Sequence, residues 1–518
     1  MAAADRSRSV GELTRRSFML GSLFVGAGAL AACSGSGSPT GAPVTASSSV
    51  VRRLEQQRRT PGQRVVSARL TPRPVEVDLG GRVVSTWGYD QNLPGPLLRA
   101  RAGDLLRVEV DNRLPVETSV HWHGLALSND MDGVPGLTQD PITAGGRFTY
   151  EFTVPDPGTY FYHSHSGLQL DRGLYGALVI DDPLEPGDYD HEWIVVLDDW
   201  LDGTGRTPDD VARDLGIGAD ASSESGDAGM GGMDHGAMGM DGMDGMDMGE
   251  ETMLSPLLGG AGDVSYPHFL VGGRVPEDPM VFTATPRQRV RIRFVNAGAD
   301  TAFRVALGGH RMTVTHTDGF PVVPQDTDAL LIGMGERFDV LVTLGDGVFP
   351  LFAQAEGKTG HGQALVRTAA GELPAQSRPE ELERRVLLGT DLAPREYVRL
   401  TERDHDLYHS VDMGGTMSPY RWTLNGRAHP DIPPLDVSEG QRVRMRMRNM
   451  SDMFHPMHLH GHTFALTDTG LRKDTVTIGP MRTVEIEFDT DNPGQWALHC
   501  HNAYHQEAGM MTTVSYLA

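Results

Sequence analysis

The strongest constraint on the fold is a pair of sequence stretches that occurs three times along the chain. The first stretch alternates apolar and polar residues and ends in an asparagine, at Asn112, Asn296 and Asn449. The second stretch follows it and leads to a glycine, at Gly158, Gly347 and Gly494. Alternation with a period of two is typical of half-buried β-strands. The chain is therefore expected to contain three copies of one β domain.

The rest of the chain supports an all-β fold class. Short alternating runs are separated by glycine and proline turns, and long helical periodicity is almost absent. These features favour Greek-key sandwiches or barrels. A length of 518 residues exceeds what one core usually supports, which agrees with three domains. We expect the domains near residues 65–185, 190–372 and 385–518.

The three copies differ in their histidines. Nine and eleven residues after the repeated asparagine, the first copy has His121 and His123, the last has His458 and His460, and the middle has Val305 and Leu307. Five and seven residues after the repeated glycine, the first copy has His163 and His165, the last has His499 and His501, and the middle has Phe352 and Gln354. Residues two apart in a strand share a face, so each pair points two imidazoles the same way. The sequence thus predicts a metal cluster between the first and last domains.

The last copy carries a further set of possible ligands. His455 precedes the third histidine pair, Cys500 lies between His499 and His501, and His505 and Met510 follow. Strand alternation sends Cys500 to the face opposite its flanking histidines. Two histidines, one cysteine and a weak axial methionine form the ligand set of a blue copper site. A zinc site would use the same imidazoles but would not need the cysteine and the methionine.

Four motifs carry a resemblance to a known family. They are His121-Trp122-His123-Gly124, His163-Ser164-His165, His455-Pro456-Met457-His458-Leu459-His460-Gly461, and His499-Cys500-His501 followed by His505 and Met510. They resemble the copper motifs of the multicopper oxidases. The resemblance implies cupredoxin-like domains, four copper ions and the reduction of dioxygen to water.

The resemblance also implies a role for each ligand. Type 1 copper would be bound by His455, Cys500, His505 and Met510, type 2 copper by His121 and His458, and the type 3 pair by His123, His163, His165, His460, His499 and His501. Dioxygen needs four electrons, whereas many donors give one at a time, so several metals would store them. Cys500 would connect the capturing copper to the cluster through its neighbours.

Two carboxylates are candidates for proton supply. The family places one shortly after the first motif, for which Asp132 is the candidate here, although a turn residue before Gly133 is an equal alternative. The family often has a second acid just after the last type 1 histidine. That position is Gln506 in this chain, and the acid comes one residue later, at Glu507.

The prediction of the electron donor is based mainly on methionines. A methionine-rich insertion spans about residues 228–253 of the middle domain, and thioethers suit Cu(I). Asp452 and Met453 lie just before His455, and Met413 and Met417 are expected on a nearby loop, so all four are candidates for binding substrate copper. We predict oxidation of Cu(I) in copper tolerance. Laccase-type oxidation of small phenols and a non-catalytic copper-sequestering role are the alternatives.

The amino terminus predicts export. Residues 1–33 resemble a twin-arginine signal joined to a lipobox, in which Cys33 would carry a lipid and attach the protein to the cell envelope. Residues 34–64 are expected to be a flexible tether. The formal net charge of −24 disfavours nucleic acid as a partner. We expect a monomer whose only contact with a membrane is this lipid.

Overall fold

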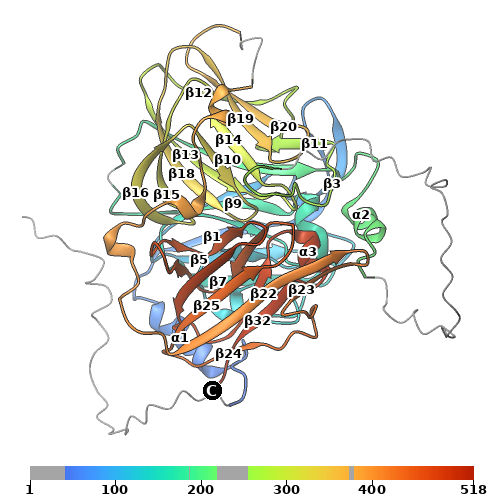
Figure 1. Ribbon diagram of the computed structural model, residues 1–518, viewed down its shortest axis with the longest axis vertical. Helices are drawn as coiled ribbons and strands as arrows, with labels where there is room; N and C mark the ends of the chain where they lie inside the picture. Colours follow the sequence, from blue (N-terminus) through green and yellow to red (C-terminus); the bar gives the residue numbers. More distant parts are fainter. Residues whose placement is uncertain (1–40, 186, 219–254, 373–377) are drawn as a thin grey trace, which may run out of the picture.

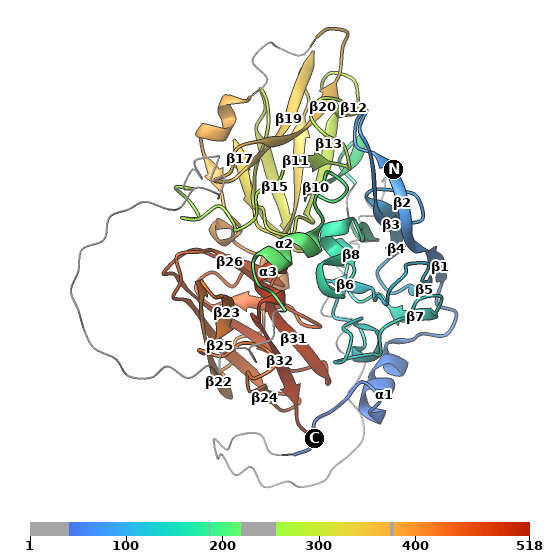
Figure 2. The ribbon, with the colours of Figure 1, turned by 90° about the vertical axis from the view of Figure 1, so that its right-hand side faces the viewer.

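The structure is a computed structural model that describes residues 41–185, 187–218, 255–372 and 378–518. Strands are its main secondary structure and form three two-layered domains, which follow the chain from blue through yellow to red in Figures 1 and 2. The prediction of an all-β fold is confirmed. In the described part of the chain, no helix has both the length and the apolar character needed to cross a membrane.

The first domain packs a three-stranded sheet on a four-stranded sheet. The three-stranded sheet has the order β1 (Val65–Leu70), β5 (Leu105–Asp111) and β7 (Arg147–Thr153). The four-stranded sheet has the order β4 (Gly95–Arg101), β9 (Tyr175–Asp181), β8 (Gly158–His163) and β6 (His121–His123). A separate pair consists of β2 (Pro72–Asp78) and β3 (Val83–Tyr89). Residues of both larger sheets, including Val108 and Leu178, share one buried core.

The middle domain consists of two six-stranded sheets. The first has the order β11 (His268–Val271), β10 (His191–Trp200), β13 (Arg289–Asn296), β18 (Arg337–Thr343), β15 (Met312–Thr317) and β16 (Phe320–Thr327). The second has the order β12 (Met280–Thr283), β20 (His361–Arg367), β19 (Val348–Ala355), β14 (Phe303–Leu307), β17 (Ala329–Ile332) and β21 (Val386–Leu387).

The last domain packs a six-stranded sheet on a five-stranded sheet. The first has the order β23 (Tyr420–Leu424), β22 (Leu407–Met417), β25 (Arg442–Asn449), β30 (Thr483–Asp489), β27 (Phe464–Leu466) and β28 (Arg472–Lys473). The second has the order β24 (Leu435–Val437), β32 (Met511–Tyr516), β31 (Gln495–Cys500), β26 (His455–Leu459) and β29 (Thr475–Ile478).

Helices are few and short among the described residues. The α-helices are α1 (Ser49–Arg58), α2 (Pro208–Asp214) and α3 (Ala503–Glu507), and the 3-10 helices are η2 (Asn129–Met131), η3 (Gly167–Arg172), η5 (Glu380–Glu383), η6 (Gly389–Asp391) and η7 (Glu396–Val398). Helix α1 corrects the prediction that residues 34–64 are a flexible tether. Its Val51 is buried, and Glu55 Oε1 accepts hydrogen bonds from the backbone and hydroxyl of Thr153, both at 3.0 Å. The Glu55 contacts hold residues 49–58 against the first domain, whereas Val51 packs in a core cluster made largely of middle-domain and last-domain residues.

The repeated asparagines explain why the histidine offsets agree between the first and last domains. The side-chain amide of each donates to the carbonyl of an isoleucine further along its domain: Asn112 to Ile142 at 2.8 Å, Asn296 to Ile332 at 2.9 Å and Asn449 to Ile478 at 3.1 Å. Asn112 and Asn449 also bind a carbonyl in the loop that leads to the next histidine strand. The same loop anchor thus sets where that strand starts.

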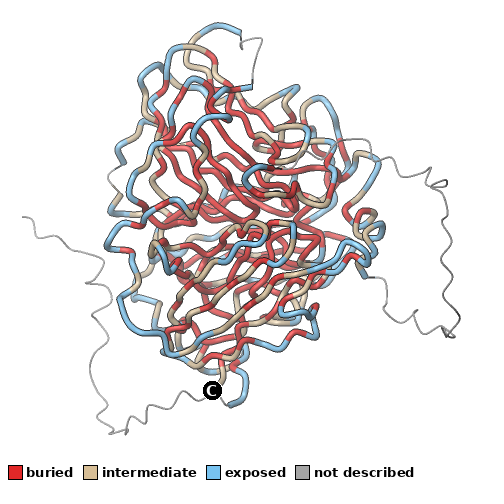
Figure 3. The backbone as a smooth tube through the Cα atoms, viewed as in Figure 1, coloured by how far each residue is buried: buried red, intermediate tan, exposed pale blue. Residues whose placement is uncertain are grey.

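One predicted strand is buried more completely than its alternation suggested. The pattern put Arg291 and Arg293 of β13 on a solvent face, but both are buried, at 3% and 1% exposure. Both bind Asp339, and Arg293 also donates to the hydroxyl of Thr159 in the first domain. The prediction of a half-buried strand is wrong here because the first domain covers this face. Figure 3 shows the buried backbone continuing through the centre of the molecule.

Candidate metal centre

Four strands from two domains bring the predicted histidines together. In the first domain β6 pairs with β8, and His121 lies opposite His163. In the last domain β26 pairs with β31, and His458 lies opposite His499. In Figure 2, β6 and β8 lie on the side of the first domain that faces the last domain.

Imidazoles cross the boundary between the two domains. The rings of His121 and His460 stack with centroids 3.9 Å apart, and those of His123 and His458 are 3.8 Å apart. His501 also belongs to this group, since its ring centroid lies 4.8 Å from that of His123. All eight rings are at least nine-tenths buried.

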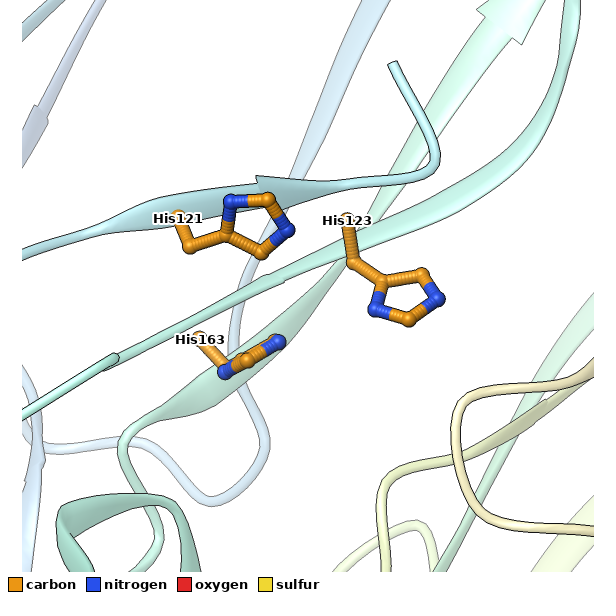
Figure 4. Close-up of side chains that lie close together, drawn as sticks. All are labelled: His121, His123 and His163. Atoms are coloured by element: carbon orange, nitrogen blue, oxygen red, sulfur yellow. The ribbon is translucent and has the colours of Figure 1, made fainter. Parts of the chain in front are cut away.

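Three sets of these histidines have ligand atoms within 4.8 Å of one another. The sets are His121, His123 and His163; His121, His458 and His460; and His165, His460 and His499. The first set is drawn in Figure 4, where the three rings converge from two neighbouring strands. The predicted cluster between the first and last domains therefore has the geometry to bind more than one ion.

Hydrogen bonds orient the rings so that one nitrogen of each faces the shared space. The Nδ1 atoms of His121, His163, His458 and His499 lie 2.8–2.9 Å from backbone carbonyl oxygens. A carbonyl can only accept, so each Nδ1 carries the proton and each Nε2 offers a lone pair. The Nε2 atoms of His121, His163 and His458 have no hydrogen-bond partner among the described residues.

His123 has the opposite orientation. Its Nε2 lies 3.0 Å from the hydroxyl oxygen of Thr475, which itself donates to Asp474 Oδ1 at 2.9 Å. The hydroxyl therefore accepts from His123 Nε2, and Nδ1 of His123 is the atom without a partner among the described residues. Outer hydrogen bonds of this kind fix the tautomer of metal-binding histidines.

A direct contact between two rings points to a cation. His460 Nδ1 donates to Asp132 Oδ2 at 3.0 Å, and His499 Nδ1 donates to a carbonyl, so both Nε2 atoms carry lone pairs. These two Nε2 atoms are 2.9 Å apart. Two lone pairs that face each other at this distance repel unless a positive ion binds both. The residues present therefore fit a metal.

Burial keeps the imidazoles neutral. It lowers the pKa of His499 to about 4 and, helped by repulsion from neighbouring histidines, lowers the pKa of His123 and His460 well below the ordinary value. The pKa values of His163, His165, His458 and His501 are lowered in the same way. Neutral imidazoles are the form that binds metal.

A second site lies on the opposite face of β31. Cys500 Sγ is 3.6 Å from Nδ1 of both His455 and His505, and these two nitrogens are 3.1 Å apart. Burial raises the pKa of the Cys500 thiol, so a nearby cation is needed to hold it as a thiolate. Met510 is fully buried, and its backbone binds those of Cys500 and His505. One soft sulfur with two imidazoles suits copper.

Comparisons with known proteins agree with this geometry. Family profiles described as multicopper oxidase match residues 73–185, 193–371 and 402–517. The chain belongs to the multicopper oxidase family. It is therefore a copper-dependent oxidoreductase that uses dioxygen as electron acceptor, as its motifs predicted.

Individual relatives align with most of the chain. Multicopper oxidase MmcO of Mycobacterium tuberculosis is 48% identical over 510 residues, which are 95% of this chain and 96% of that protein. A copper resistance protein A homolog of Pseudomonas syringae pv. tomato is 30% identical, with coverage of 86% and 91%. The crystal structure of Fet3p, a multicopper oxidase that functions in iron import, has a TM-score of 0.71 at 21% identity and coverage of 87% and 90%. The prediction of cupredoxin-like domains is confirmed.

The two candidate proton carriers lie in different environments. Asp132 is fully buried beside the oxidase cluster, where its carboxylate binds His460 and its carbonyl binds His121. Glu507 is exposed at the end of α3, where its carboxylate accepts a hydrogen bond from Gln506 at 3.3 Å. Asp132 alone of the two therefore contacts cluster histidines.

The candidate residues for binding substrate copper also lie in different environments. Asp452 is exposed, and Met453 is partly buried with its sulfur against Gly260, where an added Cβ would lie 2.8 Å from Sδ. Met413 and Met417 were expected on a loop, but the structure has both on strand β22. Met413 is fully buried in the core, whereas Met417 is 55% exposed. The predicted methionine-rich insertion and Cys33 lie outside the described residues.

Sequence reasoning missed three residues that support the two sites. Asp263 Oδ2 accepts from His505 Nε2 at 2.9 Å, and Asp474 Oδ1 lies 3.3 Å from His123 Nε2. Arg337 binds Asp474 through two hydrogen bonds. Asp263 and Arg337 belong to the middle domain, far along the chain from the histidines. No local pattern marks them, although Asp474 directly precedes the strand that pairs with β26.

Proposed function

We propose that this multicopper oxidase oxidises Cu(I) and reduces dioxygen to water, and that it serves in copper tolerance. When bound, copper would accept electrons singly from the donor and supply four of them to dioxygen. The observation that carries the proposal is the set of unpartnered imidazole nitrogens at the first and last domain boundary, next to a buried cysteine site.

The proposed ligands follow the family pattern. Type 1 copper binds His455, Cys500, His505 and Met510; type 2 copper binds His121 and His458; and the type 3 pair binds His123, His163, His165, His460, His499 and His501. Support comes from His165, His460 and His499, which form one set with converging ligand atoms. Further support comes from the free Nε2 atoms of His121 and His458.

Carboxylates and thioethers near the type 1 site favour a cationic donor. Asp263 contacts His505 Nε2 at 2.9 Å and accepts a hydrogen bond from the Tyr420 hydroxyl at 2.7 Å. Exposed Asp452 and partly buried Met453 lie just before His455. Carboxylates attract a cation, and a thioether is a soft ligand suited to Cu(I).

Further thioethers reach the surface beside this site. Met450 and Met481 are 52% and 69% exposed. Met450 directly follows the end of β25, and Met481 lies just before the start of β30. These two strand ends are neighbours, since Asn449 N donates to Arg482 O at 2.9 Å. Together with Met453 they offer soft ligands on the donor side of the last domain.

Asp132 is proposed to transfer protons to the cluster. Its Oδ2 accepts from His460 at 3.0 Å, and its Oδ1 has no hydrogen-bond partner among the described residues. A buried carboxylate with one free oxygen can hold a proton beside the reacting centre. Glu507 is less suited to this role because its side chain faces solvent.

Oxygen uptake with two donors tests the proposed substrate. Copper-loaded protein is given Cu(I) or a small phenol in parallel, with the natural chain and with residues 228–253 replaced by a glycine-serine stretch of equal length. The proposal predicts Cu(I)-driven uptake that falls with the replacement. Faster uptake with the phenol, unchanged or increased by the replacement, would instead support a laccase.

A point variant isolates the donor site. Met453→Leu preserves volume but removes the thioether, and we expect the KM for Cu(I) to rise by about tenfold while phenol kinetics stay unchanged. Met413→Leu is the matched control, because Met413 is buried in the core. Equal effects of the two substitutions would contradict a direct role for Met453.

A non-catalytic copper-sequestering protein is the other alternative. It predicts stoichiometric copper binding without oxygen uptake. Cys500→Ser separates the two: an oxidase loses its uptake and its protection against copper, whereas a sequestering protein still protects.

We also propose that the oxidase is exported by a twin-arginine route and held at the cell envelope by a lipid on Cys33. The order of the arginine pair, the apolar run and the cysteine supports this. Cys33→Ser is expected to release active protein from the membrane fraction. Membrane association that persists in this variant would contradict the lipid anchor.

A further inference from the structure

The middle domain contacts the three-copper site although it carries none of the histidine pairs. Its turn between β17 and β18 brings Gly335 and Arg337 to the boundary of the other two domains. We propose that Arg337 is a positioning residue of the cluster: it holds Asp474, which in turn orients His123 and His458. This inference rests on the proposed assignment of these two histidines to copper.

Arg337 is completely buried and touches all three domains. Its Nη1 and Nη2 donate to the two carboxylate oxygens of Asp474 at 2.7 and 2.5 Å. Its Nε donates to the carbonyl of Thr159 in the first domain at 3.1 Å, and Nη1 also donates to Gly335 O. Paired parallel hydrogen bonds fix the plane of a carboxylate, which one point charge cannot do.

Asp474 passes this orientation to the histidines. Its Oδ1 lies 3.3 Å from His123 Nε2 and 3.6 Å from His458 Nδ1, and its backbone carbonyl accepts from His458 Nδ1 at 2.9 Å. The same Oδ1 accepts from the Thr475 hydroxyl, whose oxygen contacts both rings at 3.0 and 3.1 Å. The carboxylate thus determines which nitrogen of His123 carries the proton.

A glycine gives independent evidence that this turn forms one wall of the cluster. Gly335 has a φ of +80°, and a Cβ there would lie 2.9 Å from His123 Cε1 and 2.9 Å from His501 Cδ2. Backbone therefore packs directly on two cluster rings. Only a residue without a side chain lets the turn approach so closely.

The charges around Arg337 explain why its removal should affect Asp474 in particular. Asp318 and Glu336 of the middle domain and Lys473 of the last domain are buried beside it. Lys473 Nζ lies 3.1 Å from both Asp318 and Glu336, so it already serves two carboxylates. Without Arg337, Asp474 would lose the cation that pairs with it, and its carboxylate would be free to turn away from His123.

Three variants test the inference. Arg337→Gln removes the positive charge, and Arg337→Lys restores the charge without the two parallel hydrogen bonds. Asp474→Asn keeps the shape of the carboxylate but removes its negative charge. The matched control is Arg293→Gln, since Arg293 is equally buried, pairs with Asp339 and also contacts Thr159, but touches no cluster histidine in the described contacts.

The readouts are copper retention against a chelator, the type 2 EPR spectrum and the blue type 1 absorption. For Arg337→Gln we expect cluster copper to be held about 10–100-fold more weakly and the type 2 spectrum to change, with the blue absorption unchanged. Arg337→Lys should recover only part of the loss. Arg293→Gln should lower the melting temperature without altering the type 2 spectrum.

Several results would overturn the inference. One is a type 2 spectrum and a copper retention in Arg337→Gln that equal those of the protein with the natural sequence. Another is an equal loss in Arg293→Gln. If Arg337→Gln does not fold, Asp474→Asn decides, and a natural type 2 spectrum in that variant refutes the inference. Absence of any type 2 signal from the natural protein would refute the underlying copper assignment instead.

Discussion

The first and last domains differ from the middle domain at structurally equivalent strands. β6 carries a pair of histidines, and β26 carries His458 with His460 directly after its end. At the equivalent positions β14 carries Val305 and Leu307, and both side chains are fully buried in the core. The same sandwich thus accepts either imidazoles or hydrocarbon at these positions. What distinguishes the terminal domains is that their histidine faces meet, so that each supplies the nitrogens the other lacks.

The middle domain contributes in a different way. Instead of nitrogen ligands it supplies ionic and backbone contacts, through Arg337 and Gly335 at the cluster and Asp263 at the cysteine site. Four predictions follow from this contrast between ligand-bearing and supporting domains.

The largest effect is expected when the last domain is given the residues of the middle domain. In the double variant His458→Val and His460→Leu, type 2 and type 3 copper should be lost and oxygen uptake should fall to background. The blue absorption should persist because Cys500, His455 and His505 are unchanged. Copper counting and absorption spectra check this, and retention of cluster copper would contradict the proposed ligands.

The reverse exchange should not create a site. Val305→His with Leu307→His puts two imidazoles into an apolar core with no facing domain to complete a cluster. We expect a loss of about 1–3 kcal/mol in the free energy of unfolding per histidine and no additional copper. Denaturant unfolding and metal analysis measure both, and stoichiometric extra copper would show that facing domains are not required.

A carboxylate change at the cluster should slow turnover without removing metal. Asp132→Asn keeps a hydrogen-bond acceptor for His460 but cannot hold the same proton. We expect kcat to fall about 10–100-fold with unchanged copper content. Glu507→Gln is the control, and an equal loss in that variant would mean that Asp132 has no special role.

The copper-free terminal domains should be sensitive to acid. The folded-state pKa of His499 is about 4, below the ordinary value of 6.5, so the unfolded chain takes up protons first as the pH falls. The contribution of the neutral histidines to the free energy of unfolding is therefore fully present above about pH 6.5 and is lost towards pH 4. His499 alone contributes about 3 kcal/mol. Calorimetry of copper-free protein between these values should show a falling melting temperature. A constant melting temperature would contradict the lowered pKa values.

Much of the site could be predicted from sequence because its ligands sit at fixed distances from repeated residues. Asn112 and Asn449 anchor equivalent loops, so the offset to His121 and His458 is the same in both domains. That spacing joins residues that are close in the chain, so it can be read from the sequence. It led directly to the grouping of histidines that the structure brings together.

The supporting contacts could not be predicted because they join distant parts of the chain. Asp263 and His505 are 242 residues apart, and Arg337 and Asp474 are 137 apart. Helix α1 was missed for a related reason: it is short and mostly polar, and tertiary contacts of Val51 and Glu55 hold it in place. The burial of β13 likewise depends on its neighbouring domain rather than on its own pattern.

Anomalous scattering at the copper edge, from crystals of the copper-loaded protein, tests the central claim most directly. The account predicts three peaks among the imidazoles of the first and last domains, a fourth beside Cys500 and none among β14 and β19 of the middle domain. A map with a single peak in the imidazole group, or with no peak next to Cys500, would contradict it.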